Sequence, residues 1–276
     1  MARKLTIAAS QFNVSANVNG NLKIILNQMK EAKSENADII HFPECCLVGY
    51  GGIDFFDYKS YDEKILKQAL KRITDAARDL NIWVIVGNHH FIKNQDKPFN
   101  SLYIINNKGE IIDRYDKRYL TGVEGEMDQK YYSSGTKPVL FNLKGISCGV
   151  LICHEWRYGE LYREYCALGA EIIFQSFYDG NLSPEEYIEE GKEQGKVIPG
   201  TMRGNAANNY LWISSSNISN KESTFPSFVL QPDGGMYNKL KRNIPGILIS
   251  VIDFEREFAD LSRHWRTRIL KEKYKK

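Results

Sequence analysis

A cysteine at the end of an apolar run offers the clearest chemistry in this sequence. Residues 145–152 are rich in β-branched side chains, and the charged, aromatic segment after Cys153 has apolar residues at near-helical spacing. Cys153 would therefore stand at a strand-to-helix corner, where free helical N–H groups stabilise a thiolate and a nearby oxyanion. Such a position suits a nucleophile. The alternative is a small buried thiol, which is the usual role of a free cysteine.

Two further polar residues follow predicted strands in the same way. Glu44 comes after an apolar stretch at residues 38–42 and after Pro43, which ends a strand ladder. Lys117 comes at the end of a predicted hairpin strand at residues 110–116. A carboxylate can move protons and an ammonium can stabilise an oxyanion. The alternative for each residue is a solvated strand end, because periodicity does not show whether distant residues meet.

The elements that must position these residues predict an α/β fold with mixed sheets. Strands alternate with helices in the first half, and hairpin-like strand pairs are expected near residues 101–116 and 228–252, which argues against a doubly wound parallel sheet. Strands are predicted at residues 4–11, 38–42, 83–87, 101–106, 110–116, 145–152, 171–174, 211–216, 227–231 and 246–253. Helices are predicted at residues 19–34 and 62–81, after Cys153, and in pieces over 183–209. Residues 121–138 have no periodicity and predict a functional loop.

Three segments together resemble the signature segments of the nitrilase (carbon–nitrogen hydrolase) superfamily in order and spacing, and the likeness extends from about Lys4 to about Arg268. The segments are Phe42-Pro43-Glu44, Tyr115-Asp116-Lys117-Arg118-Tyr119-Leu120 and Leu151-Ile152-Cys153-His154-Glu155-Trp156-Arg157. The resemblance implies a four-layer α-β-β-α sandwich, one domain over residues 1–276, and no metal or organic cofactor. It also implies a homodimer that extends the sandwich, and the tail 265–276 is expected at that interface or in solvent.

The resemblance also implies a Glu–Lys–Cys triad of Glu44, Lys117 and Cys153. Cys153 would attack the substrate carbonyl, and Glu44 would move protons and activate water. Lys117 would bind the oxyanion with a backbone N–H beside Cys153.

A second acidic residue is expected in the loop after the lysine. The family often places a glutamate there, ahead of an ending that residues 131–135 resemble. Counting back from that ending lands on Asp128, and a small loop shift would give the role to Glu126 or Glu124. Glu126 is preferred.

Several residues just after predicted strand ends are candidates for the substrate pocket, with ordinary packing as the alternative. They are Tyr50, His154, Trp156, Phe177, Tyr178 and Asp179. A Cys153–His154 dyad is disfavoured because neighbours on a strand point to opposite faces. His89 and His90 have no partner motif for metal binding, so no metal site is predicted.

Composition fits an ordinary globular protein. Among 276 residues, 42% are hydrophobic and 26% charged, and 37 basic against 34 acidic residues leave a net charge of +3. No run is long and apolar enough for a membrane span, and the basic tail at 263–276 does not make a nucleic-acid surface. Five cysteines without framework spacing predict reduced thiols and a cytoplasmic protein.

The predicted function is a cysteine-dependent hydrolase of a small linear carboxamide or N-carbamoyl compound. It would act through a thioester with water as the second substrate and would release ammonia. One alternative is a nitrilase that acts on a C≡N group. A further alternative is an inactive binding or scaffold protein on the same fold, although the intact set of Glu44, Lys117 and Cys153 argues against it.

Overall fold

Two mixed β-sheets lie face to face in the computed structural model, which describes residues 3–58, 63–93 and 95–273. The described residues form two six-stranded sheets, with strand orders β12-β1-β2-β3-β4-β5 and β11-β10-β9-β8-β7-β6. The first sheet consists of β1 (Lys4–Gln11), β2 (Ile39–His41), β3 (Trp83–His90), β4 (Phe99–Ile105), β5 (Ile111–Asp116) and β12 (Gly246–Asp253). The second consists of β6 (Leu140–Leu143), β7 (Ile146–Ile152), β8 (Ile172–Ser176), β9 (Trp212–Ser216), β10 (Phe228–Leu230) and β11 (Met236–Lys239). Strands β1, β2 and β3 run parallel, as do β7, β8 and β9, and the other pairings are antiparallel.

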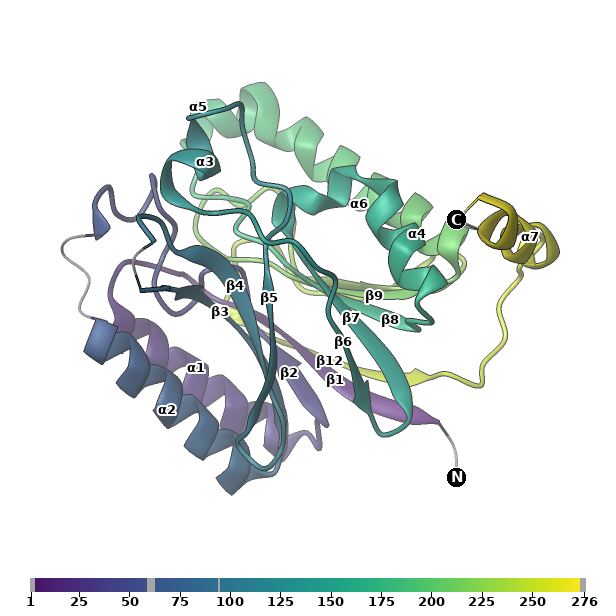
Figure 1. Ribbon diagram of the computed structural model, residues 1–276, viewed down its shortest axis with the longest axis horizontal. Helices are drawn as coiled ribbons and strands as arrows, with labels where there is room; N and C mark the ends of the chain where they lie inside the picture. Colours follow the sequence, from purple (N-terminus) through teal and green to yellow (C-terminus); the bar gives the residue numbers. More distant parts are fainter. Residues whose placement is uncertain (1–2, 59–62, 94, 274–276) are drawn as a thin grey trace.

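Helices cover the outer face of each sheet, which completes four layers (Figure 1). Helices α1 (Val18–Ser34) and α2 (Glu63–Leu80) lie on the first sheet, and α4 (Gly159–Ala167) and α6 (Lys192–Asn209) lie on the second. In α2 the buried residues recur three or four positions apart and form one apolar stripe against the sheet. These are Leu66, Ala69, Ile73 and Ala77. The predicted α-β-β-α sandwich is therefore confirmed.

Alternation along the strands divides the core between the layers. In β1, Ile7 belongs to the hydrophobic cluster between the sheets, whereas the next residue, Ala8, belongs to the cluster under α1 and α2. Both residues are fully buried. A strand that is covered on both faces has a nearly continuous apolar sequence. The sequences of β7 and β8 follow this pattern.

The predicted strand pair near residues 228–252 is wrong. Strand β10 pairs with the unpredicted β11, whereas β12 crosses to the other sheet and pairs with β1 from Lys4–Asp253 to Gln11–Gly246. Strand β11 was not predicted because it is short and largely exposed, so it has no clear apolar alternation. Strand β6 was not predicted either, because it is also short and has no clear apolar alternation.

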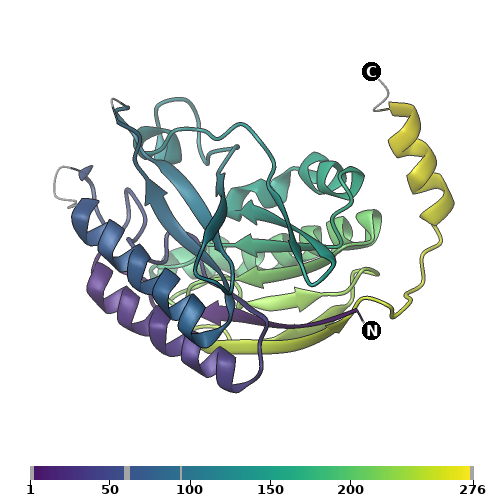
Figure 2. The same ribbon diagram turned by 60° about the horizontal axis from the view of Figure 1, so that its bottom comes forward.

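The helical pieces predicted over 183–209 are confirmed as α5 (Pro184–Glu186), a π-helical turn η3 (Tyr187–Gly191) and α6. Two other helices differ from the prediction. The loop expected at residues 121–138 contains the short helix α3 (Met127–Tyr131). Helix α7 (Arg263–Lys273), not predicted, follows an extended segment at the periphery of the sandwich (Figure 2), and its Arg266 guanidinium lies 5.4 Å from the centroid of the Tyr210 ring. Residues 274–276 of the predicted tail lie outside the described residues. Within the described ranges, no helix is both long and apolar enough to cross a membrane.

Candidate active site

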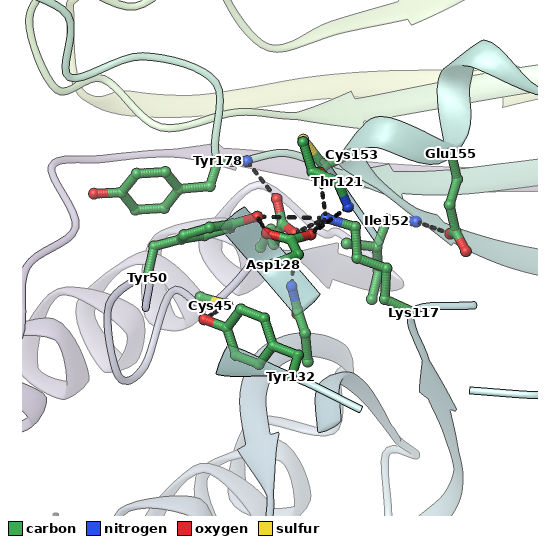
Figure 3. A network of polar contacts seen from close by, with 12 residues as sticks. Cys45, Tyr50, Lys117, Thr121, Asp128, Tyr132, Ile152, Cys153, Glu155 and Tyr178 are labelled. Carbon is green, nitrogen blue, oxygen red and sulfur yellow. Dashed lines mark hydrogen bonds and ion pairs between the residues drawn. The ribbon is translucent and has the colours of Figure 1, made fainter. Parts of the chain in front are cut away.

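Three strand ends bring the predicted triad to one place. Glu44 follows β2, Lys117 follows β5 and Cys153 follows β7, so the cluster receives residues from both sheets. Figure 3 shows Lys117 and Cys153 beside each other within a network of polar contacts. Lys117 Nζ donates to Glu44 Oε1 at 2.9 Å, and both side chains are fully buried. The structure therefore brings together residues that periodicity alone could not.

The second acidic residue that contacts the Lys117 ammonium is Asp128. The prediction of Glu126 for this position is wrong. Lys117 Nζ lies 2.7 Å from Asp128 Oδ2, which also accepts from the backbone N–H of Thr121 at 2.9 Å. Glu126 is exposed at the start of α3, and Glu124 is exposed as well. Because Asp128 lies in the first turn of α3, it turns inward, whereas Glu126 precedes the helix.

The charges around Lys117 keep it cationic. Burial alone would lower the pKa of Lys117, but the charges of Asp128, Glu44 and Cys153 raise it well above its ordinary value. Burial would conversely raise the pKa of Asp128, and Lys117 with the Tyr50 hydroxyl holds it below its usual value. The Tyr50 hydroxyl donates to Asp128 Oδ1 and lies 3.4 Å from Lys117 Nζ. Tyr50 thus belongs to the network as well as to the pocket wall.

Glu44 is fixed by groups on three other segments. Asn100 Nδ2 donates to Glu44 Oε1 at 2.7 Å, and the backbone N–H of Tyr178 donates to Oε2 at 3.0 Å. The carbonyl of Asn100 also accepts from the N–H of Lys117 at 2.9 Å, so Asn100 holds both residues. Asn100 was not predicted as a site residue, because the sequence marks it only as a polar residue within the apolar strand β4. Burial raises the pKa of Glu44, and the positive charge of Lys117 opposes that rise.

A glycine permits the close approach of the Glu44 segment to β3. A Cβ atom on Gly87 would lie 2.5 Å from the carbonyl oxygen of Pro43 and 2.6 Å from the nitrogen of Cys45, both of them backbone atoms that cannot move aside cheaply. Any side chain at Gly87 would therefore displace the backbone that carries Glu44.

Cys153 begins a turn of 3₁₀-helix, η2 (Cys153–Arg157), rather than the regular helix expected. Its φ of 39° lies in the left-handed region, which is uncommon for residues other than glycine and recurs at active sites. Gln175 Nε2 donates to the carbonyl of Cys153 at 3.2 Å and holds this conformation.

The surroundings of Cys153 favour the thiol over the thiolate. Burial, and then the negative charge of Glu44, raise the pKa of Cys153 well above its ordinary value, although Lys117 lowers it. The resting residue is therefore a thiol, and it needs a base before it can attack.

Glu155 ties the lysine segment to the cysteine segment. Its carboxylate is fully buried and accepts from the backbone N–H groups of Ile152 and Arg118, each at 2.8 Å, and from the Tyr115 hydroxyl at 2.8 and 2.9 Å. Figure 3 shows Glu155 reaching the backbone of Ile152 just before the nucleophile. Sequence analysis missed this role, although a carboxylate two residues after the cysteine was visible.

A cavity of about 720 Å³ opens over Cys153. Five of the six predicted pocket residues line it: Tyr50, His154, Trp156, Tyr178 and Asp179. The prediction for Phe177 is wrong, because its side chain is fully buried and packs edge-on against Phe225, with ring centroids 5.1 Å apart. Burial lowers the pKa of His154 to about 4, so it is neutral, and its ring packs against Tyr158. The expectation that Cys153 and His154 point to opposite faces of a strand does not hold, because the strand ends at Ile152. Both residues line the cavity.

Among the residues that the structure describes, no group of three or more His, Cys, Asp or Glu side chains could hold a metal ion. His90 Nδ1 lies 2.7 Å from the Tyr103 hydroxyl, and His89 Nε2 lies 3.2 Å from the Tyr132 hydroxyl. These histidines therefore take part in ordinary hydrogen bonds.

Several characterised proteins are similar to this chain. A 2-oxoglutaramate amidase of Bacillus subtilis is 29% identical over 174 residues, which cover 63% of this chain and 64% of that protein. A glutamine-dependent NAD(+) synthetase of Acinetobacter baylyi is 26% identical over 237 residues, or 84% of this chain and 41% of that protein. The chain thus spans less than two thirds of the length of either relative. Human omega-amidase NIT2 is 25% identical over 218 residues, covering 76% of this chain and 73% of that protein.

The fold is shared with a nitrilase-superfamily amidase of Nesterenkonia AN1, with a TM-score of 0.76 and 19% identity over 95% of this chain and 97% of that chain. The sequence pattern of the family described as carbon-nitrogen hydrolase matches residues 6–257. The resemblance predicted from three short segments is thereby confirmed, and this chain belongs to the carbon-nitrogen hydrolase family.

Proposed function

We propose that this protein is a cysteine-dependent amidohydrolase that cleaves a small linear carboxamide and releases ammonia. The observation that carries the proposal is the buried Lys117 ammonium held between Glu44 and Asp128, beside a thiol at the floor of a cavity. The names of two relatives, an amidase of 2-oxoglutaramate and an omega-amidase, support amide hydrolysis rather than nitrile hydrolysis.

In the first step Glu44 takes the proton of the Cys153 thiol while the sulfur attacks the amide carbonyl carbon. A separate base is needed because the pKa of Cys153 is raised. The ionised Glu44 is fixed by Asn100 and by the N–H of Tyr178, so it is already oriented for the transfer.

The resulting oxyanion needs positive partners. Two hydrogen bonds of Lys117 go to Glu44 and Asp128, and its remaining contacts, to Tyr50 and Thr121, are long at 3.4 Å. One ammonium proton can therefore turn to the oxyanion at little cost. The N–H of His154, at the start of the η2 turn, has no partner within that turn and is the second donor.

Collapse of the tetrahedral intermediate breaks the C–N bond. Glu44 returns its proton to the departing nitrogen, ammonia leaves and a thioester remains on Cys153. Glu44 then takes a proton from water, the hydroxide attacks the thioester, and the thiol is restored as the carboxylic acid leaves. Each proton removed by Glu44 is returned within the cycle, so no cofactor is required.

Ammonia release from a panel of amides, N-carbamoyl compounds and nitriles tests the proposal. The protein should act on short carboxamides, and Cys153→Ser should lower the rate at least about 10³-fold, because the serine hydroxyl is a far weaker nucleophile. Cys166→Ser is the matched control, since Cys166 is partly exposed, lies outside the cavity lining and donates to the carbonyl of Asn209. Turnover of nitriles alone would contradict the proposal, as would release of ammonia from none of the panel.

We also propose that residues 1–276 act as one domain and that two copies form a homodimer, as the family resemblance implies. Light scattering at micromolar concentration should give about twice the monomer mass of 31.7 kDa. A monomer at all concentrations tested would contradict the dimer and leave the chemistry untouched.

A further inference from the structure

The cavity lining outside the catalytic cluster includes a carboxylate, Asp179, and a guanidinium, Arg157. Asp179 lies three residues beyond the end of β8, and Arg157 is the last residue of the η2 turn. Both are cavity residues, but in the part of the chain that the structure describes they form no salt bridge with each other or with any other side chain. The cavity thus presents a carboxylate and a guanidinium that form no salt bridge, although the charge of Arg157 lowers the pKa of Asp179.

Asp179 is held rigidly and keeps acceptor capacity for a ligand. The Thr224 hydroxyl donates to Oδ1, and Asn217 fixes the Asp179 backbone by a hydrogen bond of 2.9 Å on each side. Burial raises the pKa of Asp179 to about 6, so the carboxylate is still ionised at neutral pH. Thr224 occupies one oxygen only, and the half-buried carboxylate in the cavity wall would be stabilised by a cationic partner.

Arg157 is prepared for an anion. Its guanidinium lies over the ring of Trp156, 4.6 Å from the centroid, and Trp156 is itself buried in the cavity wall. Stacking fixes the plane of the guanidinium but leaves its N–H groups available at the edge, where they suit the two oxygens of a carboxylate. Lys130 also lines the cavity and is exposed, as Arg157 is, but its ammonium is a point charge on a flexible stem.

On the basis of the proposed function, we propose that the cavity selects amides of zwitterionic compounds, with an ammonium group at Asp179 and a carboxylate at Arg157. A neutral amide would pair with neither charge. An amide with a single charge would satisfy one and leave the other. Only a ligand with both charges and a reachable amide, such as the side-chain amide of an α-amino acid, completes the site.

Four amides of similar length separate the two charges. Butanamide has neither, 4-aminobutanamide has the ammonium, glutaramic acid has the carboxylate, and glutamine has both. We expect the wild-type kcat/KM for glutamine to exceed that for butanamide at least about 100-fold, since each paired charge contributes about tenfold or more.

Two variants assign the charges to their residues. Asp179→Asn should lower the ratio of kcat/KM for 4-aminobutanamide to that for butanamide about tenfold, and Arg157→Gln should lower the ratio for glutaramic acid by a similar factor. Each variant should leave the other ratio within about threefold. Lys130→Gln, which removes the other cavity cation, should change neither ratio by as much as Arg157→Gln does.

The wild-type order of substrates decides the question even if a variant does not fold. Faster cleavage of butanamide or glutaramic acid than of glutamine would overturn this inference while supporting amide hydrolysis. An equal loss on all four amides in Asp179→Asn would assign Asp179 a structural role and would also overturn it. If none of the four is cleaved and the wider panel releases no ammonia, the proposed function itself fails.

Discussion

Lys117 Nζ lies closer to Asp128 Oδ2, at 2.7 Å, than to any other acceptor that it contacts, including Glu44 Oε1 at 2.9 Å. Two buried carboxylates therefore share one buried ammonium. Their surroundings differ, because Asp128 is also held by Tyr50 and the Thr121 N–H, whereas the charge of Glu44 acts on the Cys153 thiol. We therefore propose that Asp128 fixes the ammonium and that Glu44 moves protons.

Asp128→Asn should lower kcat at least about 100-fold, because it removes one of the two anions that orient Lys117. The charge of Asp128 also raises the pKa of Glu44, so the acidic limb of the kcat/KM profile should move to lower pH in this variant. Glu126→Gln is the matched control and should behave as the wild type, since Glu126 is exposed. Equal losses in the two variants would contradict the assignment of Asp128.

The wild-type pH profile reports the state of Glu44. Glu44 must be ionised to take the thiol proton, and burial raises its pKa above the ordinary value of 4.5. As the pH falls, activity should therefore be lost at a pH above 4.5. Steady-state kinetics in buffers of constant ionic strength measures this limb. A rate that stays flat below that pH would show that no group with a raised pKa has to lose its proton.

Alkylation distinguishes a proton-accepting Glu44 from a purely electrostatic one. Iodoacetamide should label Cys153 faster than the fully buried Cys45, Cys46 and Cys148. The negative charge of Glu44 raises the pKa of Cys153, so electrostatics alone predicts faster labelling in Glu44→Gln. If Glu44 takes the proton, the same variant should be labelled about tenfold more slowly or worse. Peptide mapping after timed quenching measures the labelling rate of Cys153 in the wild type and in Glu44→Gln. Faster labelling in the variant would argue against Glu44 as the base.

Glu155→Gln tests the link between the lysine and cysteine segments. The Glu155 carboxylate accepts hydrogen bonds on both oxygens. In Glu155→Gln one of these oxygens becomes an NH₂ group, whose hydrogens would point at donors, namely backbone N–H groups or the Tyr115 hydroxyl. We expect unfolding to become easier by about 2–4 kcal/mol. In the folded fraction kcat should fall about tenfold or more with little change in KM, because Cys153 and Lys117 shift relative to each other. Thermal unfolding and steady-state kinetics measure the two effects, and an unchanged kcat would show that Glu155 serves stability alone.

The sequence predicted the strand ends but not all of their partners. Apolar runs that stop at a polar residue located Glu44, Lys117 and Cys153, because the end of a buried strand is a local property. The pairing of β12 with β1 was missed because sheet partners are chosen by distant contacts. The same limit applied to Asp128, which reaches Lys117 through the inward first turn of α3, a turn too short to give a periodic pattern.

Asn100 and Glu155 could not be assigned roles from the sequence for a related reason. Each is a polar side chain within or beside an apolar segment, which marks it as unusual but does not name its partner. Their roles depend on the backbone groups of other segments, whose directions are set only when the two sheets pack together.

The most direct test of the account is the mass of the protein during turnover of a short carboxamide. Rapid quenching followed by intact mass spectrometry should show an adduct equal to the amide minus ammonia, and peptide mapping should place it on Cys153 as a thioester. The adduct should be absent in Cys153→Ala, which should also release no ammonia. Ammonia release by Cys153→Ala, or an adduct on a residue other than Cys153, would contradict the central claim.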